Sequence, residues 1–250
     1  ESAHDAESAL GYLQTFVRKD INPSDPGRVG GNRDTMDFPL FFAMESNLTN
    51  NGMSNDWRNI TGASLDLKDD GAMNGSQGVK FVQSHDSHAP ALGNTAHAMT
   101  LMLPGNAIVY YNAQEFGTGR DFPKGGRGDA LGGAYGNAIT KLVNIRNVYA
   151  QGDYRQRWLE QNEYAFERSN QSVTLLSNRT DDGFDSRTIN VDFAWGEHLV
   201  ELTGNAAKYN GWHPNGDKIP EVVTVFNDYF EGPSKINVRF LRGNNSDMGY

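Results

Sequence analysis

The sequence predicts a region of alternating strands and helices followed by an all-β region. Up to about residue 150, short apolar runs that end in polar residues alternate with helix-like segments. After that point, only short β-rich segments separated by Asn, Asp and Gly turns follow. The first pattern is typical of an α/β fold with a parallel sheet, and the second of an antiparallel β-sandwich. The change near residues 151–153 therefore predicts two domains, 1–150 and 151–250.

The central stretch of the first region is Lys80-Phe81-Val82-Gln83-Ser84-His85-Asp86-Ser87-His88. It is a short apolar run that ends in titratable residues, with Gly78 before it and Pro90 after it. Such a run predicts a buried strand. Catalytic residues of (β/α) barrels lie at the carboxyl ends of strands, so His85 and Asp86 are candidates for a functional site.

Helices are predicted on both sides of this strand. Residues 8–19 have apolar side chains at helical spacing and end in basic residues. Residues 36–40 predict a short extended piece, since Pro39 favours an extended residue before it, and a helix can start at residues 40–44. Residues 92–103 are rich in Ala, Met and Leu and stop at Pro104-Gly105. Residues 137–149 place their apolar side chains on one face of a helix.

The remaining segments of the chain are predicted to be loops and strands. Residues 49–78 are rich in Asn, Gly and Asp and predict a long loop with at most one helical turn. Residues 106–115 predict a second buried strand, and a Gly-rich loop follows at 117–136. In the all-β region, five segments have strand patterns: 164–168, 173–176, 188–193, 222–226 and 236–241.

Composition excludes several classes of protein. The chain has 22 basic and 31 acidic residues and a formal net charge of −9, which argues against nucleic acid as a partner. It has no cysteine, so disulfides and thiolate metal sites are excluded. It has no apolar stretch of membrane-spanning length, so we expect no membrane partner. Because it begins at Glu1 in mid-pattern, we interpret it as an interior fragment of a longer protein.

Three motifs, in order, resemble the α-amylase family (glycoside hydrolase family 13). Residues 37–40, Asp-Phe-Pro-Leu, resemble the passage from the sixth barrel strand into its helix. Residues 81–86 resemble the Phe-Val-x-Asn-His-Asp segment of the seventh strand, with Ser84 in place of Asn. Residues 104–115 resemble the Pro-Gly-x-Pro-x-Ile-Tyr-Tyr-Gly-x-Glu segment of the eighth strand. Here Ala107 replaces the second Pro, and Glu115 falls one residue late.

The resemblance implies a fold and an activity. The fold would be the C-terminal half of a (β/α)8 TIM-type barrel, from the end of strand 5 to helix 8, followed by a truncated antiparallel β-sandwich domain. The activity would be hydrolysis of α-glucosidic bonds in starch-like glucans or oligosaccharides by a retaining mechanism. It implies no cofactor for the fragment, calcium as a possible ion of the intact enzyme, and a monomer. The compartment stays open, with an extracellular or periplasmic location favoured.

The resemblance also assigns roles to individual residues. An Asp beside a His at a strand end could serve as metal ligand, general acid/base or acceptor of sugar hydroxyls, or could simply cap a turn. In the family, Asp86 would stabilise the oxocarbenium-like transition state and His85 would donate to a hydroxyl of the same sugar. Glu1 would occupy the position of the general acid/base. Glu115 is a candidate rim ligand. Tyr111 is a substrate-binding candidate, because tyrosine can stack on sugar rings, but buried aromatic residues are mostly core and we interpret it as largely structural.

The nucleophile of the family has no counterpart in this sequence. It is an Asp in a Gly-x-Arg-x-Asp-like segment at the end of the fourth strand. Gly119-Arg120-Asp121 lies after the eighth-strand motif, whereas the nucleophile segment of the family precedes the fifth strand. We therefore predict that the fragment alone is inactive.

Three other functions remain open. The chain could belong to a non-catalytic carbohydrate-binding or scaffold relative that lost the nucleophile. It could also belong to an α-glucan transglycosylase. A metal-dependent hydrolase could use His85, Asp86 and His88 as ligands, although no second His pair accompanies them.

Overall fold

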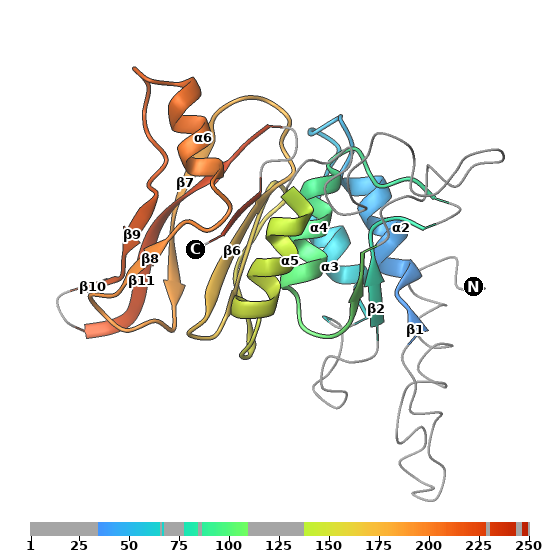
Figure 1. The fold of residues 1–250 in the computed structure, drawn as a ribbon, viewed down its shortest axis with the longest axis horizontal. Helices are drawn as coiled ribbons and strands as arrows, with labels where there is room; N and C mark the ends of the chain where they lie inside the picture. The colour runs from blue at the N-terminus through green and yellow to red at the C-terminus, as the bar shows by residue number, and fades with distance from the viewer. Residues whose placement is uncertain are drawn as a thin grey trace, which may run out of the picture.

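The structure is a computed structural model. It describes residues 35–65, 67, 78–84, 87–109, 138–228, 231–243 and 247–249. Figure 1 shows an α/β region at one end and a region of antiparallel sheets at the other. Among the helices that the structure describes, none combines the length and the apolar character needed to cross a lipid bilayer.

The α/β region contains a three-stranded parallel sheet in the order β1-β2-β3. Its strands are β1 (Thr35–Met36), β2 (Gly78–Phe81) and β3 (Ala107–Ile108). Its helices are α2 (Phe38–Asn47), α3 (Trp57–Ala63), α4 (Gly93–Met102) and α5 (Ala138–Tyr149). The described strands form an open sheet and close no barrel. The second strand of the chain, expected from residue 80 onward, lies slightly earlier and ends at Phe81.

Asp37 makes the turn from β1 into α2. Its Oδ1 accepts a hydrogen bond from the backbone N–H of Leu40 at 3.0 Å, which caps the helix, and Pro39 lies in the first turn. Its Oδ2 accepts the N–H of Leu65 at 3.1 Å, so this buried carboxylate also holds the end of α3. A Cβ at Gly78 would lie 3.0 Å from Oδ2, so glycine allows the close approach of β2. The predicted change from an extended piece to a helix is confirmed, but the helix begins at Phe38, two residues earlier than predicted.

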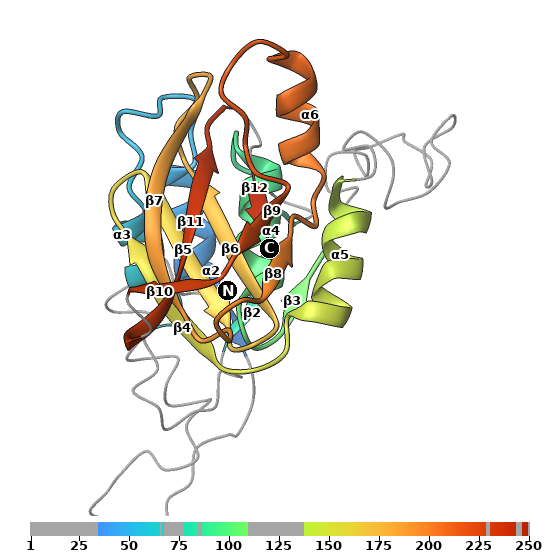
Figure 2. The same ribbon diagram turned by 90° about the vertical axis from the view of Figure 1, so that its left-hand side faces the viewer.

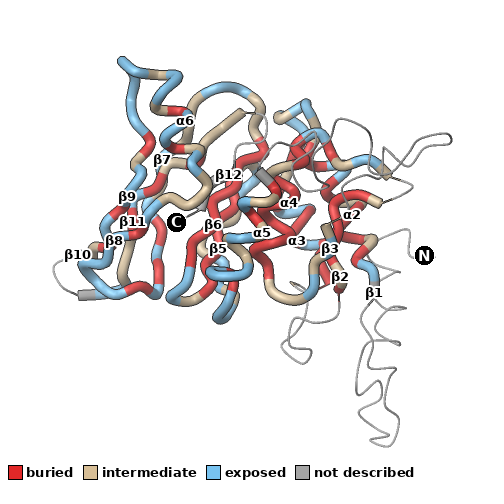
Figure 3. Tube along the Cα trace, in the orientation of Figure 1, coloured by how far each residue is buried: buried red, intermediate tan, exposed pale blue. Residues whose placement is uncertain are grey.

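The most deeply buried helix is α4, within one residue of the predicted range at each end. Almost all of its residues are buried, including the polar Thr95, His97 and Thr100. Figure 3 shows it in the buried centre of the molecule. A helix with no exposed face must be covered on all sides, and its cover includes α5 and β6.

The β-domain contains two main antiparallel sheets. One has the order β12-β6-β5-β4, and the other β10-β11-β7. The first sheet comprises β4 (Tyr154–Leu159), β5 (Glu163–Arg168), β6 (Ser172–Ser177) and β12 (Asp247–Gly249). The second comprises β7 (Phe184–Val191), β10 (Phe226–Asp228) and β11 (Glu231–Leu241). A further pair, β8 (His198–Val200) and β9 (Val222–Thr224), flanks them together with helix α6 (Asn205–Trp212).

Strands β5 and β6 are buried on both faces, because they form a middle layer. Side chains of one face, such as Ala165 and Leu175, pack with Ile189 and Val238 from β7 and β11. Side chains of the other face, Tyr164, Phe166 and Leu176, belong to the core formed with the helices. Figure 2, viewed from the β-domain side, shows β7 and β11 in front of β5 and β6.

Two arginines join the end of α4 to the elements around it. Arg146 of α5 donates to the carbonyl oxygens of Leu101, Leu103 and Gly105. Arg168 of β5 donates to the carbonyl of Met102 at 3.0 Å and to that of Gly152 at 2.8 Å. These donors satisfy carbonyls that the helix end leaves unpaired. Burial lowers the pKa of both guanidinium groups.

Several sequence expectations need correction. The all-β region contains helix α6, which was not predicted, and strands β4, β8 and β12 were also missed. The predicted strand at 222–226 is divided into β9 and β10, which lie in different sheets. The loop predicted at 49–78 contains the seven-residue helix α3, nearly two turns instead of one at most. The helix predicted at 8–19 and the loop predicted at 117–136 lie outside the described residues.

Candidate active site

The carboxyl ends of β1, β2 and β3 lie along one edge of the sheet, because the strands are parallel. The middle strand, β2, continues into Val82 and Gln83, which are both buried, and then into the half-buried Ser84. The N–H of Ser84 donates to the carbonyl oxygen of Ser87 at 3.2 Å. This hydrogen bond holds Ser84 and Ser87 close together at this edge.

Aromatic packing fixes the end of β2. The ring of Phe81 stacks on Phe41 of α2 at 4.9 Å between centroids and meets Phe38 edge-on at 5.2 Å. Phe81 and Phe41 are almost completely buried. The residues that precede the candidate site are therefore held rigidly against α2, as a preorganised site requires.

The five residues proposed for catalysis and substrate binding, Glu1, His85, Asp86, Tyr111 and Glu115, lie outside the described residues. Their roles stay predictions. What the structure does describe is the framework on which three of the motifs lie: Asp37 directly after β1, Phe81 at the end of β2, and Pro104-Gly105 directly before β3.

His88 lies near Glu45 of α2. Partial burial raises the pKa of the Glu45 carboxyl, and the nearby charge of His88 acts in the opposite direction. The backbone N–H of Leu92 donates to the carbonyl of Leu48 at 3.0 Å, which places the segment after the site against the end of α2. Among the residues with described positions, no three His, Asp or Glu side chains gather in a way that could hold a metal ion.

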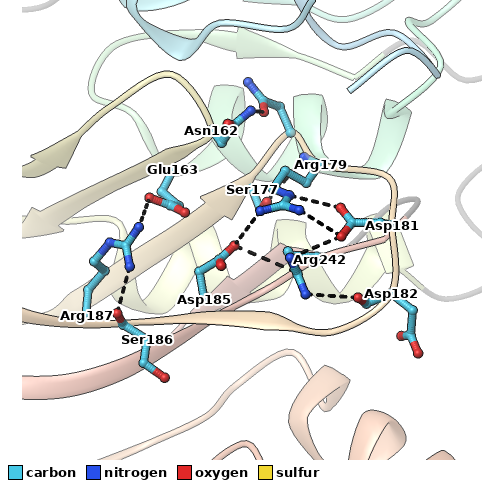
Figure 4. A network of polar contacts seen from close by, with 11 residues as sticks. Asn162, Glu163, Ser177, Arg179, Asp181, Asp182, Asp185, Ser186, Arg187 and Arg242 are labelled. Carbon is cyan, nitrogen blue, oxygen red and sulfur yellow. Dashed lines mark hydrogen bonds and ion pairs between the residues drawn. The ribbon is translucent and has the colours of Figure 1, made fainter. Parts of the chain in front are cut away.

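Carboxylates of the β-domain are engaged in ion pairs. Glu167, fully buried, lies 2.8 Å from Arg157 and also accepts the N–H of Asp192 at 3.0 Å. Glu163 is paired with Arg187 at 2.9 Å, while burial raises its pKa. Figure 4 shows this pair beside the neighbouring network of arginines and aspartates. Because they are neutralised by arginine, we interpret these carboxylates as structural.

A polar cavity at the boundary of the two regions was not foreseen from the sequence. It lies between the connection from α2 to α3 and two turns of the β-domain, and Asn and Gln side chains line much of it. The only sequence signal was the richness in asparagine, which by itself predicts turns.

The comparisons with known proteins give a fold. No protein-family model and no curated protein matches the chain. Solved structures do match. A cyclomaltodextrin glucanotransferase, CldA, has a TM-score of 0.64 at 16% identity, and the match covers 100% of this chain and 48% of that one. An α-amylase from Anoxybacillus has a TM-score of 0.56 at 16% identity, covering 88% of this chain and 47% of that chain.

A third structure, a variant of α-amylase I from Eisenia fetida in complex with maltohexaose, has a TM-score of 0.53 at 15% identity. The match covers 92% of this chain and 50% of that one. This chain therefore spans about half the length of the enzymes that it resembles. It has the fold of the corresponding part of α-amylase family enzymes, the family that its three motifs resemble.

Proposed function

We propose that this chain is the part of an α-amylase-like enzyme that comprises the second half of the catalytic barrel and the β-domain. The enzyme would cleave α-glucosidic bonds of starch-like glucans by a retaining double displacement. Transfer of the glucan to another sugar is a second outcome of the same mechanism. The similarity to a glucanotransferase supports this transfer as a second candidate reaction.

The observation that supports this proposal best is the agreement between motif order and strand order. The three motifs follow one another in the sequence at the end of β1, around the end of β2 and at the start of β3. These strands are parallel neighbours in the same order in one sheet. Residues after parallel strands meet at the carboxyl edge, where barrel enzymes have their active sites.

Each residue has a defined role in the proposed reaction. Asp86 supplies fixed negative charge beside the sugar ring as that ring becomes cationic. His85 donates to a hydroxyl of the same ring, and Glu1 protonates the leaving oxygen and later activates water. Glu115 and Tyr111 contact substrate at the rim. The nucleophile comes from sequence outside these 250 residues, so the chain alone does not complete the reaction.

The experiment uses the complete enzyme and the variant Asp86→Asn on soluble starch. Loss of a charge that acts in the transition state is expected to lower kcat by about 10²–10³-fold or more, with a smaller change in KM. The matched control is Asp217→Asn, which removes an exposed carboxylate of the β-domain and should leave kcat unchanged. Equal effects of the two variants, or an inverted product anomer by NMR, would contradict the proposal.

A further inference from the structure

The cavity at the boundary of the two regions has a volume of about 640 Å³. Small-molecule sites in proteins occupy roughly 300–1,000 Å³ and are common between domains. The cavity is lined by three segments that are distant in sequence: Asn50 to Met53, Gln161 and Asn162, and Arg179 to Asp181. None of these segments follows β1, β2 or β3 directly, so the residues that line the cavity differ from those that follow the strands at the candidate catalytic edge.

Buried amides hold the walls of this cavity in place. Asn55, fully buried, donates to the carbonyl oxygen of Asn178 at 2.9 Å. Asn178, also fully buried, donates to the carbonyl oxygen of Gln161 at 2.8 Å, and the N–H of Trp57 reaches the same oxygen at 3.0 Å. Asn162 donates to the side chain of Asn178 at 2.9 Å. The rim is therefore tied to both regions and needs little ordering when a ligand binds.

Several polar groups of the rim have spare hydrogen-bonding capacity. Within the part of the chain that the structure describes, the side-chain amides of Asn50 and Asn51 make no hydrogen bond and are exposed. Gln161 donates from its amide nitrogen to the carbonyl oxygen of Met53 at 3.3 Å, which leaves its side-chain oxygen available. Each such amide offers both donors and acceptors, which matches the donor and acceptor character of sugar hydroxyls.

The charge of the cavity favours a neutral ligand. Arg179 and Asp181 are its charged residues, and they form a bidentate pair with two contacts of 2.9 Å. Asp181 is also 3.0 Å from Arg242 (Figure 4). With its charges paired internally, the cavity has no unmatched group for an anion or a cation. The side chain of Met53, whose residue is 90% exposed, adds an apolar surface for the C–H face of a sugar ring.

We propose that this cavity is an accessory binding site for a short neutral oligosaccharide, distinct from the site of bond cleavage. A polyhydroxylated ligand uses the free amides for its hydroxyls and the Met53 side chain for its apolar face. The choice of an α-linked glucan as that ligand rests on the proposed function. The site would hold a glucan chain at the boundary of the two regions, while the carboxyl edge acts on another part of the chain.

The test measures the binding of maltotriose to the complete protein by isothermal titration calorimetry and by changes in the NMR chemical shifts of backbone amides. The variant Asn50→Ala/Asn51→Ala removes two side chains that make no internal hydrogen bond, so it should fold normally. It is expected to weaken binding at this site about tenfold, the equivalent of one or two lost hydrogen bonds. Asn190→Ala, at an exposed position of β7, is the matched control and should leave the affinity unchanged.

The outcomes separate this proposal from the proposed function. Shifts centred on Asn51, Gln161 and Thr180 that disappear in the double variant support the accessory site, whether or not the enzyme cleaves starch. Shifts confined to the segment around Gln83 and Ser84, with unchanged affinity in the double variant, overturn the accessory site and leave the proposed function intact. Absence of any maltotriose binding overturns the accessory site as well.

Discussion

The two regions of the molecule are built from contacts of different range. In the β-domain, the six-residue strands β4, β5 and β6 pair with their nearest neighbours in sequence as two hairpins, while the longer β7 and β11 pair across a greater separation. In the α/β region, parallel strands of two to four residues are joined by long connections. Antiparallel pairs are stabilised locally, whereas short parallel strands depend on the helices that cover them. The α/β region therefore relies more on its packing partners.

Those partners include the β-domain itself. Tyr164, Phe166 and Leu176 of the middle sheet lie in the same hydrophobic core as α2, α3 and α4. Trp57 of α3 contacts Tyr164 at 5.6 Å between ring centroids, and Arg168 binds the end of α4. The difference between the regions thus concerns how their strands pair, and their stability is shared through one core.

The largest expected effect comes from breaking this shared core. Trp57 is fully buried, so Trp57→Ala should lower the free energy of unfolding by about 3–5 kcal/mol, through lost burial and the cavity that remains. Urea denaturation followed by far-UV circular dichroism measures it. The control is Trp212→Ala in α6, where the residue is 69% exposed and the cost should stay below about 1 kcal/mol. Similar costs for the two changes would show that the core is not shared.

A smaller effect concerns the pH dependence of the α/β region. Burial lowers the pKa of His97 to about 4, while its Nδ1 is 2.7 Å from the carbonyl oxygen of Gly93. Since the unfolded chain binds this proton near pH 6.5, the stabilisation is complete above that pH and is lost as the pH falls toward 4. The loss should approach about 3 kcal/mol. In His97→Gln, the free energy of unfolding measured across this pH window should lack that component, and an unchanged slope would contradict the assignment.

Local patterns predicted those elements whose limits are set by nearby residues. Helix α4 was predicted within one residue at each end, because its apolar composition and the Pro104-Gly105 stop are both local signals. Helix α6 was missed, because only Ala206 and Tyr209 are buried in it and it contains a glycine and two asparagines. Strand β4 was missed because it is an edge strand whose side chains are mostly exposed or half-buried.

The candidate sites divide in a similar way. The catalytic candidates could be proposed from sequence because the strand-end motifs are contiguous, and Glu1 from the order of the segments after it. Asp86, His85, Glu1, Glu115 and Tyr111 all remain predictions. The boundary cavity was not predicted, because its lining comes from three turns, the first of which, at Asn50, lies more than a hundred residues before the other two. Only tertiary packing brings these amides together, and no periodicity in one segment marks them.

The smallest expected effects compare one glycine from each region. A Cβ at Gly62 of α3 would meet no atom within 4 Å, so Gly62→Ala should raise the free energy of unfolding by about 0.5–1 kcal/mol through the better helix propensity of alanine. Gly152, before β4, has a φ of +79°, and its Cβ would lie 2.8 Å from the carbonyl oxygen of Ser169. Gly152→Ala should therefore cost at least about 1–2 kcal/mol. Urea denaturation of both variants measures the pair. If both substitutions changed the free energy of unfolding in the same direction, the positive φ of Gly152 would not explain why glycine stands before β4.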